Sequence, residues 1–301
     1  MPPRPLWRLA GGRILDTSRP LVMGILNVTP DSFSDGGEVF GDPARALARA
    51  QEMVRAGAAL LDVGGESTRP GAATVSAEEE AARVLPVIEA LVAELPVPVS
   101  VDTRKAPVAR AALAAGAAIV NDVSGLAHDP DMGAAVAEAG AGLVLMHMRG
   151  EPGDMMQRAV YADVVREVAA ELRASVARAR AVGVEEEAIV VDPGIGFAKT
   201  AEQNLTLLRR LAELGELGRP VMVGPSRKSF LGRILDVPPP ERVAGTVAAC
   251  VAAFAGGARI FRVHDVAPVA QALRVAEAIA LEAIPDAPAH APMAAAGAAA
   301  R

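Results

Sequence analysis

The sequence has little cysteine and few aromatic residues. Its one cysteine, Cys250, excludes an intramolecular disulfide, and it lies in an alanine-rich run, 246–257, where a small buried helical residue is expected. Aromatic residues make up only 3% of the chain against 51% for all hydrophobic residues, so small aliphatic side chains must fill the core. This composition suits helices that pack closely on a parallel sheet.

The sequence also lacks long apolar runs and an excess of positive charge. No stretch of about 18 uncharged apolar residues occurs, and the N-terminal segment has no apolar core of a signal peptide. Thirty basic and thirty-six acidic residues give a formal net charge of −6, without a basic stripe interleaved with aromatics. We therefore expect a cytoplasmic protein that binds neither membranes nor nucleic acid.

Short β-rich apolar segments alternate with helical segments eight times. Strands are expected in the segments that begin at residues 21, 60, 97, 118, 142, 188, 220 and 259. Asp42 followed by Pro43 marks one helix start, and Ser76 with Glu79 predicts a capping box at another. Glycine ends several helical segments just before the next strand, at Gly57, Gly116, Gly140, Gly183 and Gly257.

This alternation predicts a single α/β domain, a (β/α)₈ TIM barrel over residues 21–284. The alternative is an open doubly wound nucleotide-binding sheet, but no strand runs into a complete G-x-G-x-x-G and no G-x-x-x-x-G-K-[ST] occurs. Residues 1–20 are expected to form an extension, with a hairpin turning at Gly11-Gly12 that plugs the barrel bottom. Residues 285–301, rich in alanine and proline, are expected to be disordered.

Each predicted strand ends in polar residues. In such a barrel the carboxyl ends of all strands point to one face, so these side chains are expected to meet there. In chain order they are Asn27, Asp62, Glu66, Asp102, Asn121, Asp122, His147, Asp192, Ser226, Lys228, Arg262, His264 and Asp265. Helix capping can explain Asp62, Asp122 and Asp265. It cannot explain the whole ring, because each unpaired buried polar group costs about 1–3 kcal/mol unless a ligand or water satisfies it.

The ring divides into two halves by its chemistry. Arg262 and His264 lie on the same side of the last strand, and with Asn27 on the neighbouring first strand they predict a phosphate-binding corner. The opposite half offers acceptors for a flat heterocycle rich in N–H groups, and one amine donor for a ring carbonyl or nitrogen. Its members are Asp102, Asn121, Asp192 and Lys228.

These strand ends resemble those of the dihydropteroate synthases over about residues 20–285. The likeness runs through "MGILNVTPDSFSDGG", "GGESTRPGA", "SVDTRK", "NDVSG", "LMHMRGEP", "DPGIGFAK", "GPSRKSFLG" and "RVHDV". The departures are slight: Ala198 stands where glycine is frequent, and Thr246 replaces a common serine.

The resemblance implies a transferase of alkyl or aryl groups other than methyl. It would condense 6-hydroxymethyl-7,8-dihydropterin pyrophosphate with p-aminobenzoate, giving 7,8-dihydropteroate and pyrophosphate in folate biosynthesis. The family's Mg²⁺ requirement, homodimeric state and role as a sulfonamide target are expected with it. An aryl amine is already neutral near pH 7, so it needs no strong base to act as the nucleophile. The hard step is the loss of pyrophosphate from the pterin substrate, and we expect a loose, cation-like transition state for it.

The resemblance also assigns roles to individual residues. The pterin would be held by Asp102, Asn121, Met146, Asp192 and Lys228. The pyrophosphate would be held by Asn27, Thr68, Arg69, Arg262 and His264, with Asn27 also placing Mg²⁺. The p-aminobenzoate would be held by Phe33, Pro70 and Ser226. The catalytic residues would be Asp35, Asp102, Asp192 and Lys228.

Three alternatives remain open. A catalytically silent pterin-binding paralogue would keep the strand ends, and a folate-dependent methyltransferase shares the acidic pocket but needs no pyrophosphate corner. A Schiff-base aldolase would use Lys228 as its nucleophile. His147 is expected to be a satisfied strand-end histidine, since no H-E-x-x-H motif or cysteine partner makes it a metal ligand.

Overall fold

The computed structural model describes residues 6–29, 42–67 and 74–285, and ten strands lie in these ranges. Their bounds are β1 Leu6–Arg8, β2 Ile14–Asp16, β3 Leu21–Asn27, β4 Leu60–Gly64, β5 Val99–Asp102, β6 Ile119–Asp122, β7 Gly142–Met146, β8 Ile189–Asp192, β9 Met222–Val223 and β10 Ile260–Val263. The last eight form one sheet in the order β8-β7-β6-β5-β4-β3-β10-β9, and each pair is parallel. A parallel bridge between Val191 and Val221 joins the two edges and closes the barrel.

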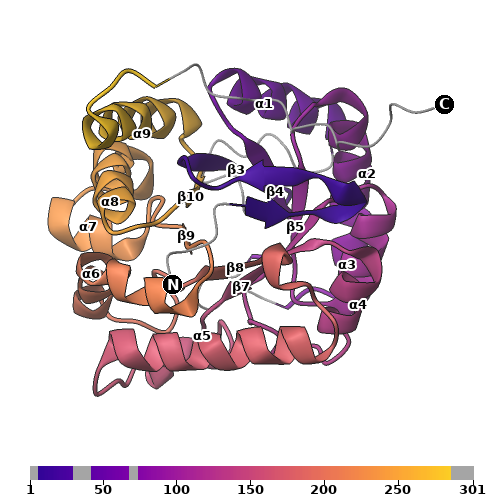
Figure 1. Ribbon diagram of the computed structural model, residues 1–301. Helices are drawn as coiled ribbons and strands as arrows, with labels where there is room; N and C mark the ends of the chain where they lie inside the picture. The colour runs from indigo at the N-terminus through magenta and orange to yellow at the C-terminus, as the bar shows by residue number, and fades with distance from the viewer. Residues whose placement is uncertain (1–5, 30–41, 68–73, 286–301) are drawn as a thin grey trace.

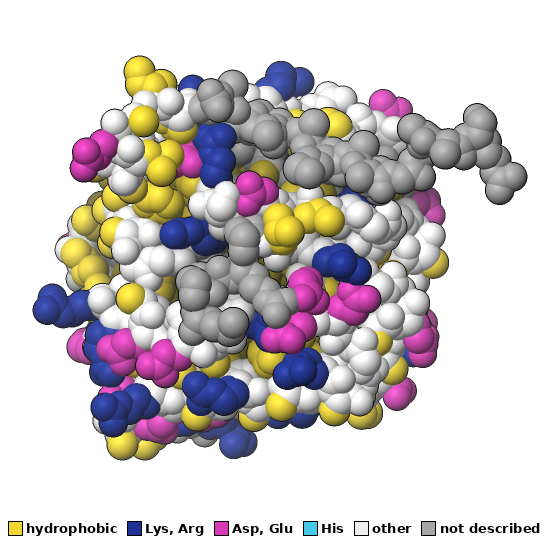
Figure 2. Space-filling model, in the orientation of Figure 1, with side chains coloured by type: hydrophobic (Ala, Val, Ile, Leu, Met, Phe, Trp, Pro, Cys, Tyr) yellow, Lys and Arg dark blue, Asp and Glu magenta, His cyan; other side chains and the backbone are white. Residues whose placement is uncertain are grey.

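Helices surround the strands as a ring (Figure 1). Their bounds are α1 Pro43–Arg55, α2 Ala77–Glu94, α3 Ala106–Ala114, α4 Met132–Ala139, α5 Val164–Ala181, α6 Ala201–Arg209, α7 Ser229–Leu235, α8 Val243–Ala255 and α9 Val266–Leu281. Hydrophobic side chains are exposed on the left of the same view, over α7, α8 and α9 (Figure 2). No helix in the described ranges is long and apolar enough to cross a membrane. The predicted (β/α)₈ barrel is confirmed.

The helix ends follow the expected chemistry, with one exception. Asp42 caps α1 by accepting hydrogen bonds from the N–H groups of residues 44 and 45, and Pro43 opens the helix. All five glycines predicted to end helices have positive φ, between 57° and 109°. Ser76 accepts the N–H of Glu79 at the start of α2, but the reciprocal half of the predicted capping box is absent from the described contacts. The carboxylate of Glu79 pairs with Arg83 instead, one turn along the helix.

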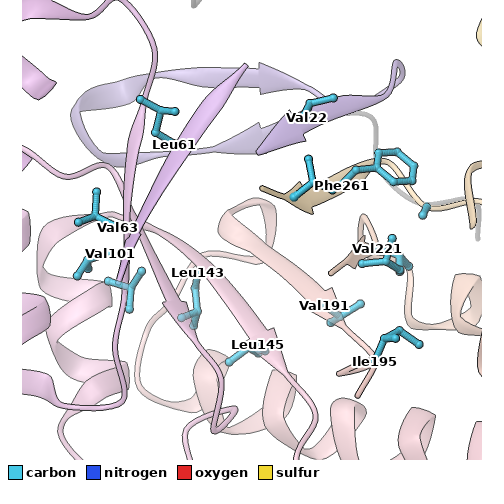
Figure 3. Packing of buried hydrophobic residues seen from close by; sticks show 14 of the residues in the cluster. Val22, Leu61, Val63, Val101, Leu143, Leu145, Val191, Ile195, Val221 and Phe261 are labelled. Atoms are coloured by element: carbon cyan, nitrogen blue, oxygen red, sulfur yellow. The ribbon is translucent and has the colours of Figure 1, made fainter. Parts of the chain in front are cut away.

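Side chains along each strand alternate between two cores. Residues that face outward pack under the helices in a large aliphatic cluster. Figure 3 labels ten of them: Val22, Leu61, Val63, Val101, Leu143, Leu145, Val191, Ile195, Val221 and Phe261. Residues that face inward near the start of the strands form a second cluster, which fills the lower half of the barrel. Its members on the barrel strands are Met23, Leu60, Ile119, Val144, Val190, Met222 and Ile260.

The N-terminal hairpin of β1 and β2 covers the lower end of the barrel. Trp7 pairs with Leu15 across the hairpin, is 0% exposed and belongs to the inner cluster. Its indole Nε1 donates to the carbonyl of Ala188, just before β8, at 2.8 Å. The turn contains Gly11 and Gly12, both with positive φ. The apolar plug closes this end, so the mouth at the carboxyl ends of the strands is where polar groups gather.

Candidate active site

The strand register brings the predicted site residues to one level. Asn27 on β3 pairs with Gly64 on β4, Gly64 with Asp102 on β5, and Asp102 with Asn121 on β6. A Cβ added at Gly64 would lie 3.6 Å from Asn27 Oδ1 and 3.7 Å from Asp102 Oδ2. Glycine therefore keeps open the space between an amide oxygen and a carboxylate. Asp192 on β8 lies two strands further round the barrel than Asn121 and two residues nearer the mouth than this level, where it pairs with Met146 on β7.

Arg262 lies at the centre of a buried polar network. Its Nε donates to Asp62 Oδ2 and its Nη2 donates to Asp102 Oδ2, both at 2.6 Å. Asp62 is 0% exposed and also accepts from Asn121 Nδ2 at 2.9 Å. The sequence placed Arg262 in a corner opposite Asp102, and this separation is wrong. A guanidinium buried inside the barrel needs counter-charges, and the two nearest strand-end carboxylates supply them.

Two acceptor atoms in this network have no hydrogen-bond partner among the described residues. They are Asp62 Oδ1 and Asn121 Oδ1, and both are buried. The Asn121 amide nitrogen must face Asp62, because a carboxylate can only accept, so its oxygen points elsewhere. Since an unmet buried acceptor costs about 1–3 kcal/mol, this oxygen is placed for a donor that the described residues do not supply.

The two predicted pterin carboxylates both hold their protons more tightly than usual. Burial raises the pKa of Asp102 to about 7, with the negative charge of Asp62 adding to the effect and Arg262 opposing it. Burial raises the pKa of Asp192 to about 6, while the Gly194 N–H and Lys228 act in the other direction. The Gly194 N–H donates to Asp192 Oδ1 at 2.6 Å. Perturbed carboxylates that meet at one mouth are typical of a functional site.

Lys228 follows β9 and lies beside a residue that the sequence did not single out. Its Nζ is 3.9 Å from the centre of the Phe197 ring. A Cβ added at Gly196 would lie 2.8 Å from Lys228 Cδ, and Gly196 has φ of +84°, so glycine is required where the lysine stem passes. Phe197 stands inside the quoted "DPGIGFAK" segment, which was the available signal.

Ser226 and His264 form a pair that joins β9 to β10. Ser226 Oγ lies 2.9 Å from His264 Nδ1 and accepts the backbone N–H of His264 at 3.2 Å. The sequence assigned these residues to different substrates, yet here they touch. Burial lowers the pKa of His264 to about 3, with Arg262 and Arg227 adding to the effect. The expected cationic couple therefore contains one cation, Arg262, and a neutral imidazole.

The remaining strand-end polar groups have structural partners. Asp122 accepts from the N–H groups of Ser124 and Leu126, and Asp265 pairs with Arg227. His147 binds Glu171 through Nε2 and Lys199 through Nδ1, so the expectation of a satisfied histidine is confirmed. Lys199 is a buried cation that the sequence did not single out, although it too ends "DPGIGFAK".

Five predicted site residues lie outside the described residues. They are Phe33, Asp35, Thr68, Arg69 and Pro70. The residues that flank the segment with Thr68, Arg69 and Pro70 are described. Glu66 accepts the backbone N–H of Val75 at 2.9 Å and forms ion pairs with Arg104 and Lys105. These contacts hold residues 66 and 75 together beside the mouth.

The described residues do not form a complete metal cage. They contain no cluster of three or more histidine, cysteine, aspartate or glutamate side chains suited to a metal. Mg²⁺ does not need one, since it keeps several waters and is usually bound by one or two protein oxygens and substrate phosphates. Asn27 Oδ1, beside the space left by Gly64, fits that limited role.

A second concavity lies at the other end of the barrel, between α3, α4 and the hairpin turn. Alanines make up half of its lining residues, and two of its three charged residues, Arg110 and Glu138, pair with each other. It lacks the convergent carboxylates of the mouth, so we assign the active site to the mouth.

A polar ring at the carboxyl ends of eight parallel strands defines a (β/α)₈ barrel enzyme. Residues 23–264 match the family described as pterin binding enzyme. A dihydropteroate synthase of Synechocystis sp. is 55% identical over 262 residues, which cover 87% of this chain and 90% of that protein.

Solved structures agree with this match. The dihydropteroate synthase of Yersinia pestis, in complex with a sulfonamide drug, has 46% identity and a TM-score of 0.87, covering 90% of this chain and 98% of that one. The enzyme of Xanthomonas albilineans, with 4-aminobenzoic acid, has 48% identity and a TM-score of 0.85, covering 93% and 99%. The chain belongs to the pterin-binding enzymes and, among them, to the dihydropteroate synthases. The methyltransferase and silent-paralogue alternatives are not favoured.

Proposed function

We propose that this protein is a transferase that condenses 6-hydroxymethyl-7,8-dihydropterin pyrophosphate with p-aminobenzoate to form 7,8-dihydropteroate and pyrophosphate. One observation carries the proposal: the buried Asn121 Oδ1, which has no hydrogen-bond partner in the described part of the chain, lies in a network with Asp62, Asp102 and Arg262. This arrangement offers acceptors to a flat, amino-substituted ring. The 4-aminobenzoic acid bound by the Xanthomonas albilineans enzyme supports the choice of the second substrate.

In this proposal the pterin lies among the acceptors of the inner ring. Asn121 Oδ1 and the carboxylates of Asp102 and Asp192 accept its N–H groups, and Lys228 donates to its ring carbonyl or a ring nitrogen. Met146, buried at the end of β7, lines the slot. Asp62 does not need to touch the ring, because its role is to accept hydrogen bonds from the Asn121 amide and the Arg262 guanidinium and so fix their positions.

The pyrophosphate lies on the side of Arg262, His264 and Asn27. We propose that Asn27 Oδ1 is one ligand of a Mg²⁺ ion held mainly by the pyrophosphate itself, in keeping with the oxygen preference of that ion. When bound, Mg²⁺ would supply charge neutralisation to the leaving group. Arg262 adds a fixed positive charge, held in place by two carboxylates. The neutral His264 contributes a hydrogen bond instead of a charge.

The reaction begins with the break of the bond between the pterin methylene carbon and the pyrophosphate oxygen. Arg262 stabilises negative charge on the departing oxygen, while the carboxylates of Asp102 and Asp192 face the electron-rich ring that spreads the positive charge. The lone pair of the neutral aryl amine then forms the carbon–nitrogen bond, and the amine nitrogen loses its extra proton to the departed pyrophosphate. Ser226 positions the carboxylate of p-aminobenzoate.

A pyrophosphate-release assay tests the proposed function. Release should require both substrates and Mg²⁺, and omission of any one should abolish it. A matched pair of variants sharpens the result: Asp192→Asn, in the ring, should lower turnover, and Asp154→Asn, on an exposed segment, should not. Pterin binding without pyrophosphate release in the wild type would indicate a silent paralogue and contradict the proposal.

We also propose that the protein is a homodimer that associates through α7, α8 and α9. Ile234 on α7 and Val275 and Ile279 on α9 are all more than half exposed, and Ile279 reaches 73%. Apolar side chains gathered on one face are typical of a subunit interface. Sedimentation should give a dimer for the wild type and a monomer for Ile279→Glu. Val160→Glu, at an equally exposed apolar site in a loop, should remain dimeric.

A further inference from the structure

Lys199 is a buried cation with every donor used. Its side chain follows the β8–α6 loop back into the protein and is 2% exposed. The ammonium lies within hydrogen-bond distance of four acceptors: Phe197 O at 2.9 Å, His147 Nδ1 at 3.0 Å, Gly194 O at 3.1 Å and His147 O at 3.4 Å. An ammonium has three N–H groups, and the three shortest of these contacts match them one for one.

Glu171 fixes the form of His147 that this arrangement needs. Its carboxylate oxygen lies 2.9 Å from His147 Nε2 and can only accept, so Nε2 carries the hydrogen. The lone pair on Nδ1 then faces Lys199. Burial lowers the pKa of His147 to about 4, with Lys199 adding to the effect, which keeps the imidazole neutral. Burial also lowers the pKa of Lys199 to about 7, and Asp192 and Glu171 oppose this.

The carbonyls held by Lys199 belong to an unusual stretch of backbone. Gly194 has φ of +69°, and a Cβ there would lie 2.0 Å from the carbonyl oxygen of His147, so the loop touches the end of β7. Ala198 has φ of +47°, a left-handed conformation that few residues with side chains adopt. The Tyr161 hydroxyl donates to the carbonyl of Ala198 at 3.0 Å.

Two of the residues whose carbonyls Lys199 holds, Gly194 and Phe197, also contact a side chain that we assign to the pterin. Gly194 uses its N–H to hold Asp192 Oδ1 and its carbonyl to accept from Lys199. Phe197 uses its ring to support Lys228 and its carbonyl to accept from the same ammonium. One buried lysine thus ties together a carboxylate and an amine assigned to the pterin.

We propose that Lys199 is a positioning residue for pterin recognition: it holds the β8–α6 loop so that Asp192 and Lys228 face the ligand at the correct spacing. The inference rests on the proposed function, because it takes Asp192 and Lys228 as pterin contacts. Lys199 itself touches no substrate. Its removal should therefore weaken pterin binding more than p-aminobenzoate binding, which relies on Ser226 in another loop.

Lys199→Met tests the proposal, because methionine keeps an unbranched side chain and removes all three donors. Calorimetry with 6-hydroxymethylpterin should give a Kd raised by about 10- to 100-fold, the range typical of residues that orient a binding group. At saturating pterin substrate, the KM for p-aminobenzoate should change by less than about threefold. If the methionine variant does not fold, Lys199→Gln retains amide donors and should show the same split with a smaller increase.

Arg219→Met is the matched control. Arg219 is also a buried cation, but it pairs with Glu186 at the other end of the barrel. This variant should lose stability without a change in the Kd for 6-hydroxymethylpterin. An unchanged Kd in a folded Lys199 variant would overturn the proposal, and so would equal losses for both substrates or an equal loss in Arg219→Met. Failure of wild-type turnover would instead contradict the proposed function, since pterin binding is measured without turnover.

Discussion

Asp102 should make the protein less stable as the pH rises. Its pKa is about 7 in the folded protein, raised chiefly by burial, against an ordinary value of 3.8. Between these values the folded protein keeps a proton that the unfolded chain has lost. A group with a raised folded pKa contributes stability below its unfolded pKa and loses that contribution as the pH rises through the folded pKa. Each pH unit between the two pKa values lowers the free energy of unfolding by about 1.4 kcal/mol, so the total loss is about 4 kcal/mol.

The measurement compares wild type with Asp102→Asn, which removes the titrating group and keeps the shape. Urea unfolding of both proteins from pH 4 to pH 8 gives two stability curves. The wild type should lose about 4 kcal/mol relative to the variant across this range. In Asp102→Asn, Arg262 keeps Asp62 as its counter-charge, so the network should persist.

Asp163→Asn provides the control of opposite sign. Hydrogen bonds from the N–H of Arg166 and from Arg210 lower the pKa of Asp163, so wild type should gain stability relative to this variant as the pH rises. A difference between wild type and Asp102→Asn that stays constant within about 1 kcal/mol would refute the reasoning. It would mean that Asp102 ionises at its ordinary pH despite its burial.

Three further predictions concern the plug, the two substrates and the metal. Trp7→Ala should lower the free energy of unfolding in urea by about 3–5 kcal/mol, because it empties a buried site and removes a hydrogen bond. Trp7→Phe should lower it less. A loss below about 1 kcal/mol for Trp7→Ala would argue against the plug. Lys228→Ala should weaken pterin binding by about 1.5–3 kcal/mol, the worth of a charged hydrogen bond, and Ser226→Ala should weaken p-aminobenzoate binding more than pterin binding. Equal losses for both ligands in calorimetry would contradict that assignment. EDTA should abolish pyrophosphate release and Mg²⁺ restore it, with Asn27→Ala needing more Mg²⁺; an unaltered Mg²⁺ requirement in that variant would rule out Asn27 as a ligand.

Local rules predicted much of the fold. Eight β-rich segments became the eight barrel strands, because continuous apolar runs between glycine-terminated helices leave parallel pairing as the way to bury both faces. The hairpin follows from Gly11-Gly12, whose positive φ values only glycine adopts easily. Only the Ser76 half of the predicted capping box forms among the described contacts, because the Glu79 carboxylate pairs with Arg83 one helical turn away.

The sequence predicted where the site lies in the barrel better than it predicted which side chains contact one another there. Strand ends located Asp102, Asn121 and Asp192 at one mouth, since topology fixes the end from which a residue projects. The carboxylate that binds Arg262 is determined by the barrel radius and by burial. Neither can be read from the sequence of a single strand. Lys199 was missed for the same reason, because its acceptors come from two loops that meet only after folding.

The plug hairpin determines what intrinsic fluorescence can report. The chain has a single tryptophan, and Trp7 lies in the apolar cluster at the end of the barrel opposite the mouth. Its emission should track unfolding closely, because the indole leaves a dry environment only when the barrel opens. The same emission should change little when substrates bind, so titrations of ligand affinity need calorimetry or a label placed near β8 and β9.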